Sequence, residues 1–204
     1  EPESMPEPES MPEPESMPEP ESMPEPEAPM MQAEPGHMPV YRVPVRVHIG
    51  DSELEGEELR QVLQEVNLIW YTQAGICFEM RTVDDDTVMD DGFDIWFRAE
   101  RRGGVNGQYS GAHNIFSVDY PRLGDAPNPT DHPASRTAAH ELGHGLSLGH
   151  DNCGTACYDK LMSSGRKGWQ LDDAEIDAAR GRARSRYALS DLEPSNCGAP
   201  NVHR

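Results

Sequence analysis

The sequence predicts an α/β domain: a twisted mixed sheet with a backing helix, a second helix below a cleft and a third helix near the C-terminus. Two patterns indicate this class. Residues 41–49 alternate between apolar and polar side chains, as in a strand with one buried face. Apolar residues then recur at helical spacing over 59–70, and a second strand pattern follows at 76–83. Strand, helix and strand in this order form a crossover unit, which favours parallel pairing.

The first 37 residues differ in composition from the rest of the 204-residue chain. The sequence EPESMP occurs four times in succession, and residues 1–36 contain eleven glutamates and no Lys or Arg. Regular proline favours an extended chain and like charges repel, so this stretch has no means of forming a core. We expect residues 1–37 to be a disordered acidic spacer, and residues 38–204 to form one domain.

Particular residues bear on the place of the first strand in the sheet and on the ends of the first helix. Pro44 lies inside the strand pattern and has no N–H for a ladder hydrogen bond, so we expect an edge position, a bulge or an N–H direction without a partner. The helix begins behind Ser52 and several glutamates. Gly75 is placed to end it in the left-handed conformation.

The remaining elements follow from similar patterns. We expect strands at 93–97 and 114–120, an edge strand near 106–112 within a glycine-rich loop, and helices at 135–148 and 173–187. Ser135 follows a proline and is expected to be the N-cap of its helix. Asp172 and Glu175 are spaced as a capping box for the last helix.

Composition excludes two classes of partner. The formal net charge is −20, of which about −9 belongs to the chain beyond the spacer, whereas a nucleic-acid binder needs a basic stripe. No apolar run approaches the ~20 residues of a transmembrane helix. The four cysteines form an even set that could make two disulfides outside the reducing cytosol. We therefore expect a secreted or extracellular monomer, which the acidic repeat could tether to a cell surface.

The strongest chemical signal is HELGHGLSLGHD at residues 140–151. His140 and His144 are four residues apart, so on a helix both rings project from one face and can hold a zinc ion at ~2.0–2.1 Å. Glu141 lies beside the first histidine, where its carboxylate can accept a proton from water. The chain must turn after the helix to bring His150 to the same ion. Three neutral imidazoles leave one position open, which is typical of a catalytic zinc site.

This pattern resembles the HExxHxxGxxH signature of the metzincin zinc peptidases, and Met162 in LMSS resembles the residue of their methionine turn. The resemblance covers about residues 38–190. It implies an endopeptidase that cleaves proteins or peptides with one catalytic Zn²⁺. It also implies ligand roles for the three histidines, a general base at Glu141 and a buried methionine beneath the metal. Asp151 and the cysteine pair before the turn are more similar to adamalysins than to matrixins, which leaves the subfamily open.

The chain departs from that signature at Ser147, where the pattern has glycine. The resemblance implies a sharp turn there, often with a positive φ, which strains a residue other than glycine by about 1 kcal/mol. As alternatives, Gly149 could absorb part of the turn, or the serine hydroxyl could bond to its own backbone.

Three further questions concern function, pairing and a second metal. A zinc-stabilised protein-binding module without catalysis is the alternative function, although such a module has no use for Glu141. The cysteines allow three pairings. We favour one disulfide between Cys153 and Cys157 and a second between Cys77 and Cys197. The acidic loop at 84–94 offers oxygen ligands for calcium, but its spacing fits no EF-hand.

The substrate is expected to lie extended along the cleft. By analogy, it would add itself as a strand beside the edge strand near 106–112. Specificity would then depend on a pocket between His150 and Trp169.

Overall fold

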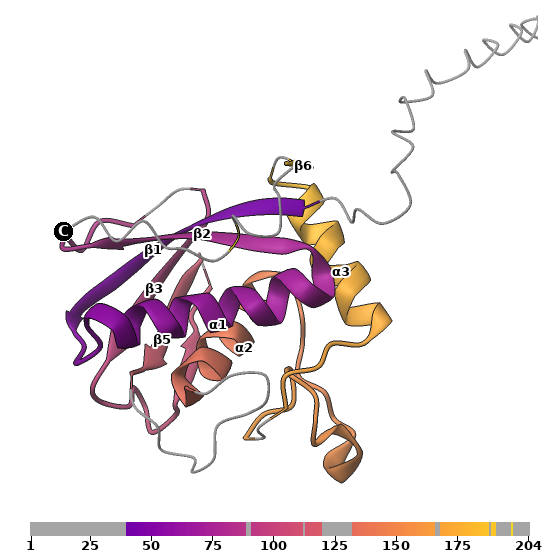
Figure 1. Cartoon of the computed structure of the whole chain (residues 1–204). Coiled ribbons are helices and arrows are strands. Elements are labelled where there is room, and N and C mark those ends of the chain that lie inside the picture. The colour runs from indigo at the N-terminus through magenta and orange to yellow at the C-terminus, as the bar shows by residue number, and fades with distance from the viewer. Residues whose placement is uncertain are drawn as a thin grey trace, which may run out of the picture.

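The structure, a computed structural model, describes residues 40–88, 91–111, 113–119, 132–165, 168–187, 189–190 and 197. The spacer expected at 1–37 lies outside these residues. The predicted α/β class is confirmed, because the described residues form one mixed sheet together with three α-helices (Figure 1). None of the described helices is both long and apolar enough to cross a membrane.

The strands join one six-stranded sheet in the order β2-β1-β3-β5-β4, with β6 paired to the start of β1. The first four strands in this order run parallel, and β4 is antiparallel to β5 at the end of the sheet. Their bounds are β1 (Val40–Asp51), β2 (Ile76–Val83), β3 (Phe93–Arg98), β4 (Gly107–Tyr109), β5 (Asn114–Val118) and β6 (Leu189–Ser190). The edge strand expected near 106–112 is therefore confirmed at 107–109.

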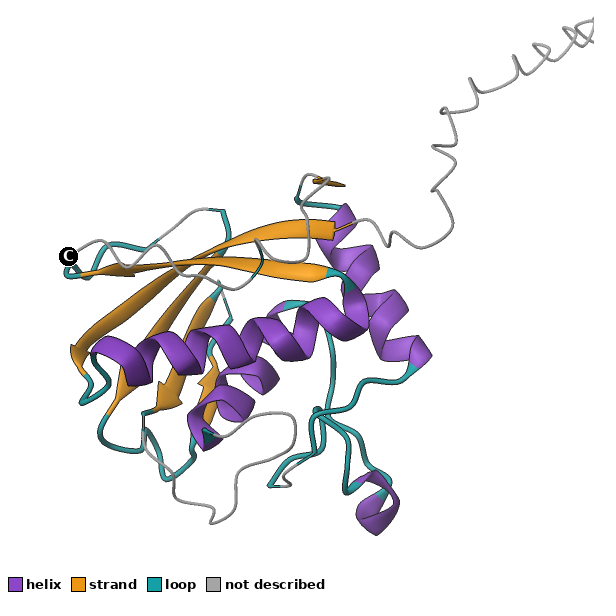
Figure 2. Cartoon of the chain, viewed as in Figure 1, coloured by secondary structure: helices purple, strands orange, loops and turns teal. Residues whose placement is uncertain are grey.

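The three helices are α1 (Gly56–Ala74), α2 (Pro133–Gly145) and α3 (Asp173–Arg184). Helix α1 runs along one face of the sheet (Figure 2). Helix α2 packs against α1 and against strands β4 and β5. Gly75 ends α1 with a φ of 60°, as expected. Buried Trp70 on α1 donates from Nε1 to the Ala139 carbonyl of α2 over 3.1 Å. Helix α1 therefore fixes the position of α2, the helix that carries HELGH.

Strand β1 is internal rather than at an edge, and Pro44 lies opposite Glu79 of β2, one residue before the pairing with β3 begins. Of the three alternatives for Pro44, an N–H direction without a partner is therefore the one that fits. The expectation that Ser135 is the N-cap of α2 is wrong. The N-cap of α2 is His132, whose Nδ1 accepts from the Ala134 N–H. Ser135 is instead drawn to α1, because its hydroxyl donates to the buried carboxylate of Glu65 over 2.6 Å.

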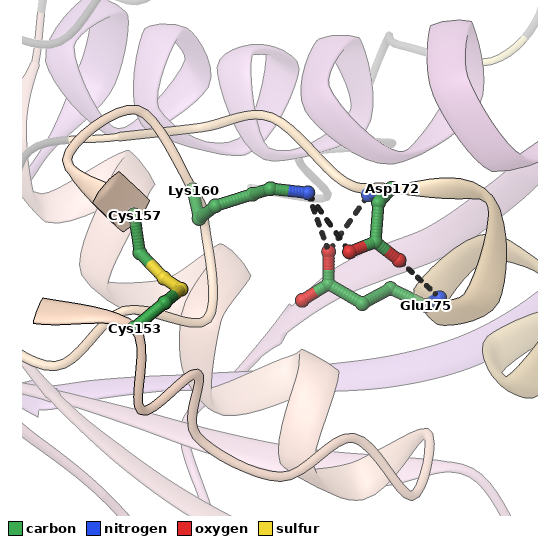
Figure 3. The surroundings of a disulfide bond; sticks show 5 residues. All are labelled: Cys153, Cys157, Lys160, Asp172 and Glu175. Carbon is green, nitrogen blue, oxygen red and sulfur yellow. Dashed lines mark hydrogen bonds and ion pairs between the residues drawn. A yellow bond between two sulfur atoms is a disulfide. The ribbon is translucent and has the colours of Figure 1, made fainter.

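Both favoured disulfides are confirmed. Cys77 on β2 is bonded to Cys197, with Cα atoms 5.6 Å apart, and Cys153 is bonded to Cys157 around the short 3₁₀ helix η1 (Gly154–Cys157). Beyond η1, Lys160 Nζ lies 2.9 Å from Asp172 Oδ2 at the start of α3 (Figure 3). Asp172 also forms the expected capping box with Glu175. The segment between His150 and α3 is therefore held by the Cys153–Cys157 disulfide near its start and by Asp172 at its end.

The outer edge of β2 is closed by a side chain of α1. The Asn67 amide donates to the Phe78 carbonyl over 2.9 Å and accepts from the Phe78 N–H over 2.8 Å. All of these groups are buried. A sheet edge leaves backbone groups without partners, and here one asparagine satisfies both.

Replacing Asn67 with alanine should therefore lower the free energy of unfolding by about 3 kcal/mol, because two buried backbone groups lose their partner. Leu68→Ala on the exposed side of α1 is the matched control and should change it by less than about 0.5 kcal/mol. Urea unfolding followed by circular dichroism measures both. Equal midpoints for the two variants would show that Asn67 does not hold this edge.

Candidate metal centre

The turn after α2 is a Schellman motif with serine in its left-handed position. The Leu148 N–H donates to the Gly143 carbonyl and the Ser147 N–H to the His144 carbonyl, each over 3.0 Å. This pair of bonds defines the motif. The residue at the position of Ser147 is normally glycine. Ser147 has a φ of 73°, whereas Gly149 has no positive φ. The turn implied by the resemblance is thus present, and Ser147 rather than Gly149 carries it.

This turn brings the three predicted histidines together. His150 Nε2 lies 3.2 Å from His140 Nε2 and 3.0 Å from His144 Nε2. Three ligands at ~2.0–2.1 Å around a tetrahedral ion lie about 3.3 Å apart. The spacing therefore fits one metal ion. His140 is buried, His144 is half-buried and His150 is exposed, so the site opens on one side.

Backbone carbonyls fix which nitrogen of each helix histidine is free. His140 Nδ1 lies 2.7 Å from the Leu161 carbonyl, and His144 Nδ1 lies 2.9 Å from the Leu148 carbonyl. Because a carbonyl can only accept, each Nδ1 carries the proton and each Nε2 presents a lone pair. Burial lowers the pKa of His140 to about 3, helped by the charge of Arg136, and burial also lowers the pKa of His144. Both rings are therefore neutral, as metal ligands must be.

Met162 lies beneath this helix as predicted. It is fully buried, and a Cβ built on Gly143 would come 2.5 Å from its sulfur, so only glycine allows α2 to lie this close. The Met162 carbonyl accepts from the N–H of Asp151, directly after the third histidine. The segment around Met162 therefore supports both α2 and the loop that carries His150.

Glu141 faces β4 across the cleft. A Cβ on Gly107 would come 2.6 Å from its Oε1, so glycine is needed for the edge strand to approach the carboxylate. Burial raises the pKa of Glu141 to about 7, while a hydrogen bond from the Tyr109 backbone and the charge of Arg136 act in the opposite direction. A carboxyl group with a pKa near neutrality suits a general base at physiological pH.

These groups line one open cleft of about 570 Å³. Its walls are the segment 101–109 that leads into β4, helix α2 and the residues after the methionine turn. His140, Glu141, His144 and His150 all face it. Trp169 does not line this cleft, and Ser164 and Gly165 lie there instead. The described lining of the cleft on this side is thus the loop after Met162, and the pocket expected between His150 and Trp169 stays a prediction.

The structure also bears on the other metal-site expectation. Among the described residues, the three histidines are the one group of three or more potential ligands whose ligand atoms lie close together. In the acidic loop, Asp85 accepts from both the N–H and the hydroxyl of Thr87, which is a local turn. The described part of that loop therefore does not gather its carboxylates into a calcium site.

Arg136 was not among the residues predicted for the site. It lies one helical turn before His140, donates from Nη2 to the Leu161 and Ser163 carbonyls over 2.7 and 2.8 Å, and donates from Nε to the Gly168 carbonyl over 3.0 Å. The guanidinium thus joins α2 to both sides of the loop after Met162. The i, i+4 spacing from His140 was the signal available, but a lone arginine on a helix is usually a surface residue.

No protein-family model matches the sequence, and no curated protein is significantly similar to it. The geometry of the site therefore carries the functional argument.

Replacing Ser147 with glycine should raise the free energy of unfolding by about 1 kcal/mol, because glycine adopts the left-handed conformation without strain. Gly149→Ala is the control: its φ is not positive and a Cβ there meets open space, so stability should change by less than about 0.5 kcal/mol. Thermal unfolding of the metal-free proteins measures both. A stabilising Gly149→Ala with a neutral Ser147→Gly would contradict the assignment of strain to Ser147.

Proposed function

We propose that this protein is a zinc-dependent endopeptidase related to the metzincins. The observation that carries the proposal is the convergence of three imidazole Nε2 atoms, two of them fixed as lone-pair donors, at a spacing that suits a tetrahedral ion. A metal with three neutral imidazole ligands keeps an open position. Glu141 lies in the same cleft with a pKa near neutrality.

Each residue of the site has a distinct task in this proposal. His140, His144 and His150 would hold the ion. The chemistry that zinc supplies in such a setting is Lewis-acid activation of water and of a carbonyl group. Glu141 would accept the proton from the attacking water and later deliver it to the leaving amine. The carboxylate is held by the Tyr109 backbone, so its direction is fixed before a substrate arrives.

The free side of β4 offers a place for the substrate chain. Strand β4 pairs with β5 on one side, and its residues line the cleft with the other. An extended peptide could add itself there by main-chain hydrogen bonds, which would bring a scissile carbonyl between Glu141 and the histidines. Backbone recognition of this kind suits an enzyme that cleaves many sequences.

We also propose that the protein works outside the cytosol. Two disulfides join all four cysteines. Such bonds persist in oxidising compartments and are rare where thiols are kept reduced.

Glu141→Gln should bind about one zinc ion like the wild type, but cleave an unfolded protein substrate at least about a hundredfold more slowly, because proton transfer is lost while the ligands remain. The exposed Glu55→Gln at the N-cap of α1, which does not line the cleft, is the control and should leave cleavage unchanged. A chelator should abolish wild-type cleavage, and added zinc should restore it. If the wild type holds zinc but cleaves nothing, the protein is better described as a binding module.

Replacing His150 with alanine should weaken zinc binding by more than about a hundredfold, since even outer partners of a ligand are worth 10–100-fold. His113→Asn is the matched control, because His113 does not line the cleft and asparagine tolerates its φ of 70°. Competition with a chromophoric chelator gives both affinities. Unchanged affinity in His150→Ala would place the ion elsewhere.

A further inference from the structure

Arg136 is a buried cation that forms no direct ion pair, although the charge of Glu141 in the same cleft acts on it. Its side chain is 7% exposed, and no ion pair joins it to an acidic group among the residues that the structure describes. Burial lowers its pKa only to about 10, so the guanidinium remains charged at neutral pH. Removing a charge from water is costly unless it is paired and hydrogen-bonded. Three backbone carbonyls offset part of that cost, but none of them carries the opposite charge.

The three carbonyl bonds leave one nitrogen of this guanidinium unused. Nε and Nη2 make all three carbonyl bonds, and Nη1 makes none of them. Arg136 also lines the cleft together with Thr137, His140 and Glu141. A guanidinium is a fork of donors that matches a carboxylate. The cleft therefore contains a fixed donor for an anionic group about one helical turn from the candidate metal ligands.

The rim of the cleft is positively charged, as Arg136 is. Arg101 and Arg102 line it and are exposed, and neither forms an ion pair with a described acidic residue. Glu141 is the one acidic residue among the described residues that line the cleft. The whole chain has 37 acidic and 17 basic residues, so this excess of arginine is opposite to the overall charge. A positive cleft in a negative protein attracts anionic segments.

We propose that the cleft selects protein substrates that place an aspartate or glutamate side chain next to the cleaved bond, where it pairs with Arg136. Arg101 and Arg102 would add a weaker attraction for acidic segments along the rim. This inference rests on the proposed peptidase function. It names the substrate class and makes Arg136 the residue that determines specificity.

Arg136 can support the loop after Met162 and also recognise the substrate. The loss of each role has a different effect on cleavage. As a clamp, the guanidinium supports the loop from Leu161 to Gly168, and its loss would slow cleavage of every substrate alike. As a specificity residue, it would distinguish substrates that are identical except for one charge. The relevant quantity is therefore a ratio between two matched peptides, because a general loss of activity cancels from it.

The first experiment uses the zinc-loaded wild type and a set of peptides that carry Glu, Gln or Leu at each of the two positions on either side of the cleaved bond. At one position, kcat/KM for Glu should exceed that for Gln by roughly tenfold to a hundredfold, as expected for a hydrogen bond between charged groups away from water. This ratio should persist from about 0.05 to about 0.5 M salt, because a buried pair is little screened. Equal rates for Glu and Gln at every position would overturn the inference while leaving the peptidase function intact.

Two variants locate the preference. Arg136→Gln should reduce the Glu-to-Gln ratio to near one, whereas Arg101→Gln with Arg102→Gln should keep the ratio and lose only a salt-sensitive gain of a few fold. Unfolding curves show whether Arg136→Gln still folds. If it does not, the wild-type ratio and its salt dependence decide the matter, because a preference from the rim alone would disappear in salt.

A complete lack of cleavage would count against the peptidase function rather than against the charge preference. In that case the fluorescently labelled Glu and Gln peptides are titrated with the zinc-loaded wild type, and anisotropy gives their affinities. Tighter binding of the Glu peptide by tenfold or more would support the anionic site. Equal affinities would overturn it.

Discussion

The arrangement of the site depends on bringing His150 Nε2 to 3.2 Å from His140 Nε2 and to 3.0 Å from His144 Nε2. Lone pairs at this separation repel unless a cation lies between them, so the surrounding chain must hold the rings against that repulsion. The left-handed turn at Ser147 directs the chain back, and the carbonyls of Leu148 and Leu161 fix two rings. Helix α1, through Trp70, prevents α2 from moving away. Each of these contacts costs conformational freedom that a bound ion would repay.

The Leu161 carbonyl joins the metal ligands to the rest of the cleft. It accepts from His140 Nδ1 and from Arg136 Nη2, so one backbone oxygen orients a ligand and anchors a charge. Since both donors lie on the same helix, a shift of the loop after Met162 would disturb both together. The geometry of the candidate metal site and the shape of the cleft wall are therefore mechanically coupled. The shared carbonyl also offsets part of the cost of burying the arginine.

Periodicity and short-range spacing were enough to predict most of the fold and the cluster of three histidines. Alternation located β1, helical spacing located α1, and the capping box at Asp172 is as expected. Predictions failed where a distant side chain competes for the same group, as when Glu65 takes the hydroxyl of Ser135. The role of Arg136 and the approach of Gly107 to Glu141 likewise depend on contacts between segments about 30 residues apart, which local patterns do not contain.

The Cys77–Cys197 bond has a topological consequence. Its two cysteines are separated by 120 positions in the sequence, and α2, all three histidines and Met162 lie between them. A backbone cut at any one point in this interval would leave both fragments covalently joined, in contact through the sheet and able to close again. If the protein is the proposed endopeptidase, each molecule is also a substrate for other copies. This covalent ring would let a molecule survive its first nick with the metal ligands still assembled.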